Sequence, residues 1–453
     1  MCQPPYPGRI RLDPDEKVPF VFVVRELSER GMDEAGLLLW QVLRDVRAWV
    51  QAISAPDEPT LREEGWKLEG IVPALAATLP PLDRLLRRPD PDEDTARAVA
   101  MACLHLGLWA EDSAAGRTAL ALFQAAEDAD PDNAHYPYHV GRMARKLAMY
   151  DEAEAWLKWA GWVARGSGEW EVAALCTSGL GNLHRQRGNL PLAKRYHTLV
   201  WKTARRHNLR TLEGDALYDL VGLSFDFGDA RQGMEYARRA VEAYGPGHGR
   251  IITLARDIAW LWMDCFGEFE SAAHVFTALL DHMWEPSDRL LLCANLSRAA
   301  AGAGWTEVFE GMWIETWAMM RQQPLRHRHA AALTQLALAA GNLGWWERAG
   351  IAAAEALQVA RLRREGELIL LAESIQAAVQ AGVIAEDAIR NVFRDSRHPR
   401  SKERDVSVAD LASIFTSAMR VRRDGAPEGP TRTLIYNCGS VPGSSEASTT
   451  SGG

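Results

Sequence analysis

The chain has 453 residues, 47% of them hydrophobic and 25% charged, with 36 glycines, 22 prolines and a formal net charge of −9. This composition excludes a chain that is disordered throughout, a collagen-like rod and a coiled-coil rod. No run of 18 uncharged apolar residues occurs, and Asp13, Asp15 and Glu16 stand beside the short apolar run at 20–24, so neither a membrane span nor a signal peptide is expected and the protein is predicted to be cytoplasmic.

The N-terminal part is predicted to be helical but without a repeat signature. Residues 1–14 are interpreted as a flexible N-terminus, and residues 15–96 as a helical cap or one or two degenerate helix pairs. Loops are expected at 54–59 and 89–94. Apolar residues recur there at helical spacing: Leu37, Leu38, Trp40, Val42, Leu43, Val46 and Trp49.

From Ala100 onward the sequence repeats itself. The first unit contains Cys103, Leu106, Gly107, Ala110, Ala119, Phe123, Ala126 and Pro131. The second follows 34 residues later with Val140, Gly141, Ala144, the run Met149-Tyr150-Asp151-Glu152-Ala153, Leu157 and Ala160. Later copies follow at a longer period, because their equivalent positions 153, 193, 233, 272, 309 and 349 are 40, 40, 39, 37 and 40 residues apart. A period of this length indicates a repeat array.

The pattern in residues 97–361 resembles the tetratricopeptide repeat (TPR) family, in its long-repeat bacterial form. The resemblance implies an all-α fold: a right-handed α-solenoid of about seven TPR-like helix pairs, with helical caps. It also implies that the first helix of each pair lines a concave groove that binds an extended peptide.

Physical chemistry supports the same architecture. Each predicted helix has one apolar stripe, which an isolated pair cannot bury and which stacked neighbours can. Small residues at 107, 141, 181 and 337 are expected where two helices cross closely. Glycines at 188, 228, 267, 304 and 344 are expected to end the first helices in the left-handed conformation.

The C-terminal part is predicted as capping helices at 362–423 and a disordered tail at 424–453. Helices are expected near 365–381 and 385–394. A last helix is expected to start at Ser407 and Asp410. Its apolar face comprises Val408, Leu411, Ala412, Phe415 and Met419.

We expect no catalytic centre, cofactor or metal. The pair Gly179 and Gly181 lacks the third glycine of a dinucleotide loop, and no Gly-Lys-Ser/Thr phosphate loop occurs. His135 and His139 share one helix face without the glutamate of a zinc protease, so stacking or surface histidines are the favoured interpretation. Six cysteines without a Cys-x-x-Cys pair indicate free thiols.

Charge is unevenly distributed. Residues 172–212 contain no acidic residue and carry a formal charge of +8, which leaves −17 for the remainder. This segregation predicts a local field that attracts anions. The alternative is that the cations after Lys194 coat an outer helix. Three tryptophans in turns, Trp305, Trp345 and Trp346, are candidates for contact with a partner.

The TPR resemblance also indicates which residues bind a peptide. The family's groove residues lie one, four and five places beyond the crossing position, which implies that the site comprises Arg142, Arg145, Lys146, Asn182, Arg185 and Gln186. Arginine, lysine and asparagine can hold carboxylates and peptide amides. In the alternative interpretation, the cations pair with Glu111 and Asp112.

The sequence therefore predicts a non-catalytic scaffold or adaptor that binds a segment of another protein or a peptide, and an acidic segment suits the basic stretch. A ligand- or peptide-responsive regulatory module in transcription or signalling is the alternative. Direct binding of nucleic acid through residues 172–212 is a third reading, against which the acidic remainder argues. No membrane partner is expected, and the oligomeric state is left open.

Overall fold

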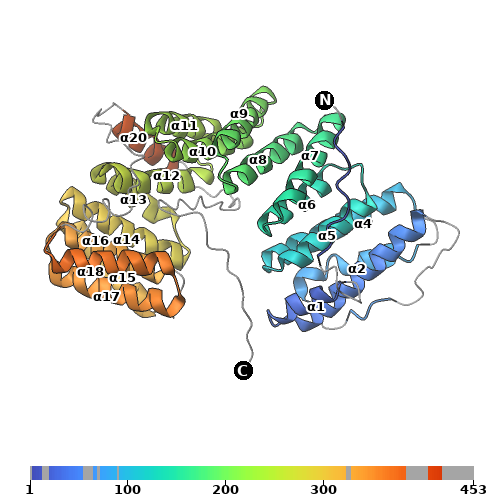
Figure 1. Cartoon of the computed structure of the whole chain (residues 1–453), viewed down its shortest axis with the longest axis horizontal. Coiled ribbons are helices and arrows are strands. Elements are labelled where there is room, and N and C mark those ends of the chain that lie inside the picture. The colour runs from blue at the N-terminus through green and yellow to red at the C-terminus, as the bar shows by residue number, and fades with distance from the viewer. Residues whose placement is uncertain are drawn as a thin grey trace. The chain divides into compact units, whose positions relative to one another are not determined.

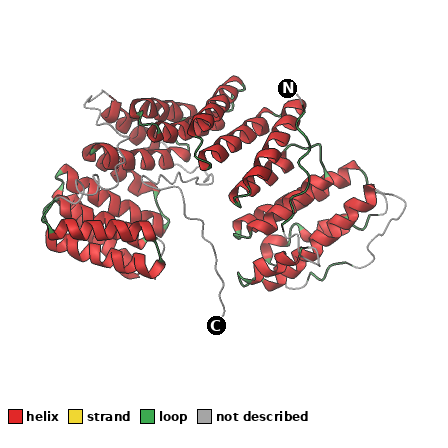
Figure 2. Cartoon of the chain, viewed as in Figure 1, coloured by secondary structure: helices red, strands yellow, loops and turns green. Residues whose placement is uncertain are grey.

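The apolar stripes form helices, and no strand occurs among the residues that the structure describes (Figure 2). The structure is a computed structural model that describes residues 3–12, 20–54, 65–68, 72–88, 91–322, 328–383 and 407–420. Most successive helices pack against one another in pairs. The chain is therefore an all-α helical-repeat protein.

The chain divides into two compact units, residues 1–216 and 217–453 (Figure 1). The first begins with α1 (Val21–Ser28), α2 (Asp33–Ser54), the 3₁₀ turn η1 (Pro73–Leu75) and α3 (Leu79–Leu85). Three pairs follow: α4 (Glu93–Asp112) with α5 (Gly116–Ala129), α6 (His135–Lys146) with α7 (Tyr150–Ser167), and α8 (Trp170–Gln186) with α9 (Leu190–Arg206).

The second unit continues the repeat. Its helices are α10 (Arg210–Asp226), which begins before the boundary, α11 (Ala230–Tyr244), α12 (Arg250–Leu261), α13 (Phe269–Leu279), α14 (Pro286–Ala303), α15 (Thr306–Gln322), α16 (His329–Asn342), α17 (Trp346–Arg363), α18 (Gly366–Gln380) and α20 (Ser407–Arg420). A π-helical turn, η2 (Trp262–Phe266), extends α12, and a 3₁₀ turn, η3 (Leu280–His282), extends α13.

The predicted crossing positions are confirmed in the first unit. A Cβ atom on Gly107 would lie 2.5 Å from the ring of Phe123, and one on Gly141 would lie 2.8 Å from Leu157. At Gly181 it would lie 2.6 Å from the His197 ring. In each of these three pairs, the second helix thus inserts a large side chain into the space that a glycine leaves on the first helix.

The predicted turn glycines are also confirmed. All five have positive φ angles between 70° and 78° and end a first helix: Gly188, Gly228, Gly267, Gly304 and Gly344. In the first two pairs, Ala114 and Ala148 hold the same left-handed conformation, each with φ of 59°. These two pairs therefore keep the turn geometry without its preferred residue.

The repeat places the equivalent position on the second helix of each pair in the core. The equivalent residues from 153 to 349 are all buried: Ala153, Ala193, Gly233, Ala272, Phe309 and Ala349. Of the turn tryptophans, Trp305, Trp345 and Trp346 are partly buried. Trp345 packs edge-on against Phe309 at 5.1 Å between ring centroids, so packing within the array uses part of its surface.

The N-terminal prediction needs two corrections. The predicted stripe of α2 is buried at Val42, Leu43, Val46 and Trp49, but Leu37 is 51% exposed and Leu39, which was not predicted, is buried. Residues 3–12, predicted to be part of a flexible terminus, pack against α5 and α7 instead. Ile10 is buried there, and the ring of Tyr6 contacts two tryptophans of α7.

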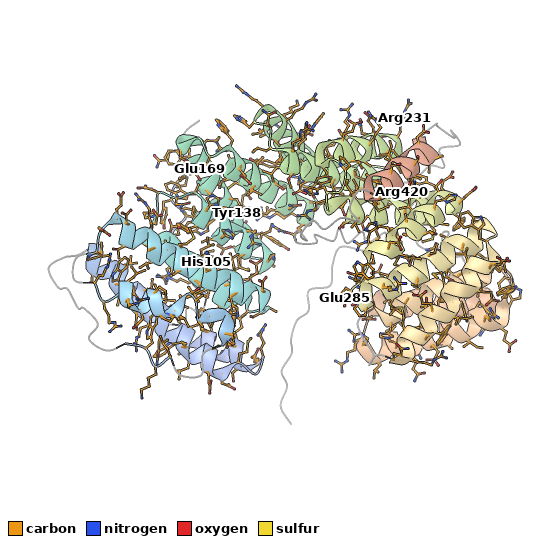
Figure 3. All side chains as sticks on the ribbon, turned by 180° about the vertical axis from the view of Figure 1, so that it is seen from behind. His105, Tyr138, Glu169, Arg231, Glu285 and Arg420 are labelled. Atoms are coloured by element: carbon orange, nitrogen blue, oxygen red, sulfur yellow. The ribbon has the colours of Figure 1, made fainter. Side chains whose placement is uncertain are left out.

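The C-terminal helices were predicted to close the end of the array. Helix α18 follows α17 as expected, and Leu411, Ala412, Phe415 and Met419 of α20 are buried as predicted. However, α20 packs against α11, α12 and α13 in the middle of the repeats, where Arg420 and Arg231 are labelled in Figure 3. The helix predicted at 385–394 and the tail at 424–453 lie outside the described residues.

The crossing glycines generate a stability prediction. We expect Gly107→Ala to destabilise the first unit by about 1–3 kcal/mol, because the new methyl group would overlap the buried ring of Phe123. The matched control is Gly166→Ala, near the end of α7, where nothing lies within 4 Å of the added Cβ. Thermal unfolding followed by circular dichroism should show a lower Tm for the first variant only. Equal Tm values would contradict the assigned helix crossing.

Candidate functional site

The six predicted site residues lie on two adjacent first helices. Arg142, Arg145 and Lys146 are on α6, and Asn182, Arg185 and Gln186 are on α8. Helices α6 and α8 contact each other, and side chains join α6 to α4 on its other side. We call the surface of these six residues together with Glu111 and Asp112 the first-helix face. Figure 3 labels one residue on each of two of these helices, His105 on α4 and Tyr138 on α6.

Glu111 organises one side of this face. It lies four residues after Gly107 on α4, and its carboxylate accepts hydrogen bonds from both guanidinium ends of Arg142, one of them at 2.8 Å. Lys146 pairs with the same carboxylate. The alternative interpretation of the sequence is therefore confirmed for these two cations at Glu111.

The ion pairs change how Glu111 titrates. Desolvation raises the pKa of its carboxyl group, but the hydrogen bonds and charges of Arg142 and Lys146 outweigh this and hold the pKa below its ordinary value. The carboxylate therefore stays ionised near neutral pH and pairs with both cations.

The second side of the face connects α6 to α8. Arg145 Nη1 donates a hydrogen bond of 3.0 Å to Gln186 Oε1. Asn182 and Arg185 are partly buried, and Gln186 is exposed. Side-chain contacts thus join Arg142, Arg145, Lys146 and Gln186 across α4, α6 and α8, and Asn182 and Arg185 lie beside Gln186 on α8.

The electrostatic balance of the face is positive. The first-helix face carries four cationic side chains and two carboxylates. The cations are Arg142, Arg145, Lys146 and Arg185, and the carboxylates are Glu111 and the exposed Asp112. Charged and amide groups fixed in this way can accept carboxylates and peptide amides from a ligand.

The other cations of the basic stretch lie elsewhere. Arg187 pairs with Glu154 at 2.6 Å and also with Asp151, both on α7. On the second helix α9 and just beyond it, Arg195, Lys202, Arg205, Arg206 and Arg210 are exposed. Their position agrees with the reading that cations after Lys194 coat an outer helix.

A related arrangement occurs in the second unit, and the sequence analysis missed it. Buried Arg298 on α14 pairs with Asp264 at 3.0 Å and donates to Gln335 Oε1 of α16 at 2.9 Å. Asp264 precedes Arg298 by 34 residues, much as Glu111 precedes Arg142 by 31. An acidic residue followed by an arginine about one repeat later was the sequence signal that could have identified both ion pairs.

The two histidines of α6 have different contacts, because His135 lies 3.7 Å from Glu169 and His139 packs against an aromatic ring. His139 is largely buried, its ring lies 5.0 Å from that of Phe123, and desolvation followed by the charge of Arg142 lowers its pKa to about 3. It stays neutral and stacks, as the sequence suggested. Among the residues that the structure describes, no group of three or more His, Cys, Asp or Glu side chains could hold a metal ion.

Comparisons with known proteins add little to this picture. No protein-family model matches the chain, and no curated protein matches it by sequence. Among solved structures, a Rap protein complexed with Competence and Sporulation Factor is similar over 81% of this chain and 100% of the Rap chain, at 11% identity and a TM-score of 0.32. A TM-score this low identifies no shared fold by itself, so the helical-repeat assignment depends on this chain's own helix pairs. Within the described helices, none has the length and apolar character needed to cross a membrane.

The Glu111 network predicts a pH dependence. A lowered folded-state pKa contributes stability above the unfolded pKa, and this contribution is lost as pH falls through the folded value. We therefore expect Glu111→Gln to cost about 1–2 kcal/mol at pH 7, and less as the pH approaches 3. The control is Asp112→Asn, an exposed neighbour. Tm values at both pH values check this, and an equal loss at pH 7 and pH 3 would show that the ionised carboxylate is not what stabilises the face.

Proposed function

We propose that this protein is a non-catalytic helical-repeat scaffold that binds an acidic peptide segment on its first-helix face. The observation that carries the proposal is the set of polar contacts across three successive first helices. Glu111 of α4 holds Arg142 and Lys146 of α6, and Arg145 of α6 holds Gln186 of α8. These contacts preorganise the face, which lowers the entropy lost when a ligand binds.

The distribution of charge supports an acidic ligand. The cations that we propose to meet the ligand are Arg145 and Arg185, one on each of the neighbouring first helices α6 and α8. Both lie four residues beyond a crossing glycine, Gly141 or Gly181, and so occupy the same place in successive repeats. An extended segment with two acidic side chains could contact both helices.

The test uses random peptides displayed on phage and selected against the full chain. We expect the selected peptides to be rich in Asp and Glu, and the double variant Arg145→Glu, Arg185→Glu to bind them at least tenfold more weakly, because like charges would then oppose each other. Arg142 is left unchanged since Glu111 needs it. Fluorescence anisotropy of a selected peptide gives the affinity.

The control carries the same change in charge on another helix. Arg195→Glu, Lys202→Glu alters two exposed residues of α9 and should leave the affinity within about twofold. If both double variants lose binding equally, net charge rather than the first-helix face determines affinity. If neither does, the proposed site is wrong although the fold stands.

A further inference from the structure

Residues 3–12 lie as an extended segment against the second helices α5 and α7. Tyr6 Oη donates a hydrogen bond of 2.9 Å to Glu127 Oε2 near the end of α5. Its ring packs edge-on against Trp156 and Trp159 of α7, with centroids 5.5 and 5.3 Å apart. The tyrosine therefore makes both an aromatic and a polar contact, although half of its surface remains exposed.

Two further contacts define the direction of the segment. Arg9 pairs with Asp128 at 3.3 Å, next to the contact of Tyr6. Arg117, at the start of α5, donates to the carbonyl oxygen of Leu12. The segment thus runs antiparallel to α5, with the tyrosine near the end of that helix and Leu12 near its beginning.

The sequence of the segment suits this mode of binding. It reads Gln-Pro-Pro-Tyr-Pro-Gly-Arg-Ile-Arg-Leu, with three prolines around the tyrosine. Proline-rich segments favour the extended polyproline conformation, so they lose little entropy when they dock on surfaces lined by aromatic side chains. Trp156 and Trp159 provide such a surface.

Helix α5 carries buried polar groups, at Glu127 and one turn before it, that the segment does not satisfy. Glu127 and Gln124, one turn apart on α5, are 1% and 2% exposed. Glu127 Oε1 and Gln124 Nε2 have no hydrogen-bond partner among the protein atoms. A buried polar atom without a partner is destabilising, so a ligand that supplies one could bind more tightly than residues 3–12 do.

Glu127 can also serve as either donor or acceptor. Desolvation by burial raises the pKa of its carboxyl group to about 7, against a smaller lowering by the hydrogen bond from Tyr6 and the charge of Arg9, with Asp128 adding to the rise. Near neutral pH the carboxyl group is therefore protonated part of the time. It can accept from a tyrosine hydroxyl or donate to a carbonyl oxygen.

We propose that Gln124, Glu127, Asp128, Trp156 and Trp159, which we call the arm site, form a second peptide-binding site. Its ligand is a proline-rich extended segment with a tyrosine and, three residues later, an arginine. Residues 3–12 are its built-in occupant, and a partner protein's segment of the same chemistry displaces them. The arm site lies on second helices, so this inference does not depend on the function proposed for the first-helix face.

The test measures binding of a labelled synthetic peptide with the sequence of residues 3–12 to the full chain. The recipient is the double variant Tyr6→Ala, Arg9→Ala, whose own segment loses its contacts with Glu127 and Asp128. We expect the peptide to bind this variant at least tenfold more tightly than the wild type, where the tethered segment competes at a high effective concentration. A peptide with phenylalanine in place of the tyrosine should bind severalfold more weakly, because it lacks the hydroxyl group.

The controls separate the arm site from non-specific adsorption. In the double-variant background, Trp159→Ala should remove most of the binding, whereas Glu152→Gln, an exposed change on the same helix, should not alter it. Circular dichroism verifies that each variant is folded. If the double variant does not fold, Tyr6→Phe serves as the recipient and should bind the peptide severalfold more tightly than the wild type. A folded recipient that does not bind the peptide, or binding that Trp159→Ala leaves unchanged, would overturn the proposal.

Discussion

The close approach of paired helices in the first unit is the constraint on which its candidate sites depend. A glycine on each first helix lets Phe123, Leu157 or His197 of the second helix approach to 2.5–2.8 Å from where a Cβ atom would lie, which is closer than van der Waals contact allows. Because this contact fixes the rotation of each helix about its axis, residues one, four and five positions later face the neighbouring repeat. Glu111, Arg142, Arg145 and Gln186 meet for this reason, although they are remote in sequence.

Charge pairing between repeats then adds specificity to packing. In the first unit, Glu111 and Arg142 are only partly buried, so their ion pair leaves polar surface that a ligand could contact. In the second unit, Arg298 is almost fully buried, and its contacts to Asp264 and Gln335 link three first helices internally. The pairing of an acid with an arginine of the next repeat thus organises a surface in the first unit and stabilises the interior of the second. A buried arginine needs partners of this kind because an unpaired charge there would be very costly.

Features that repeat locally could be predicted from the sequence, and features that depend on distant contacts could not. The helix pairs, the crossing glycines and the turn glycines follow from spacing, because each depends on residues within one repeat. The apolar face of α20 was predicted from its period, but such a pattern shows only that a face is buried, and α11–α13 cover it. The candidate face was located through its repeat position, whereas the partner of each cation depended on which helix lay beside it. Residues 1–14 were predicted to be flexible, because nothing local indicated that Trp156 and Trp159 would contact Tyr6.

The position of α20 has a consequence for how the second unit folds during synthesis. Most contacts between repeats join helices that are adjacent in the sequence, so they can form as the chain leaves the ribosome. Phe415 meets Trp262 only after α13 to α18 have been translated, a delay of roughly ten seconds at ordinary elongation rates. Until then α20 cannot cover the apolar surface that it buries on α11–α13.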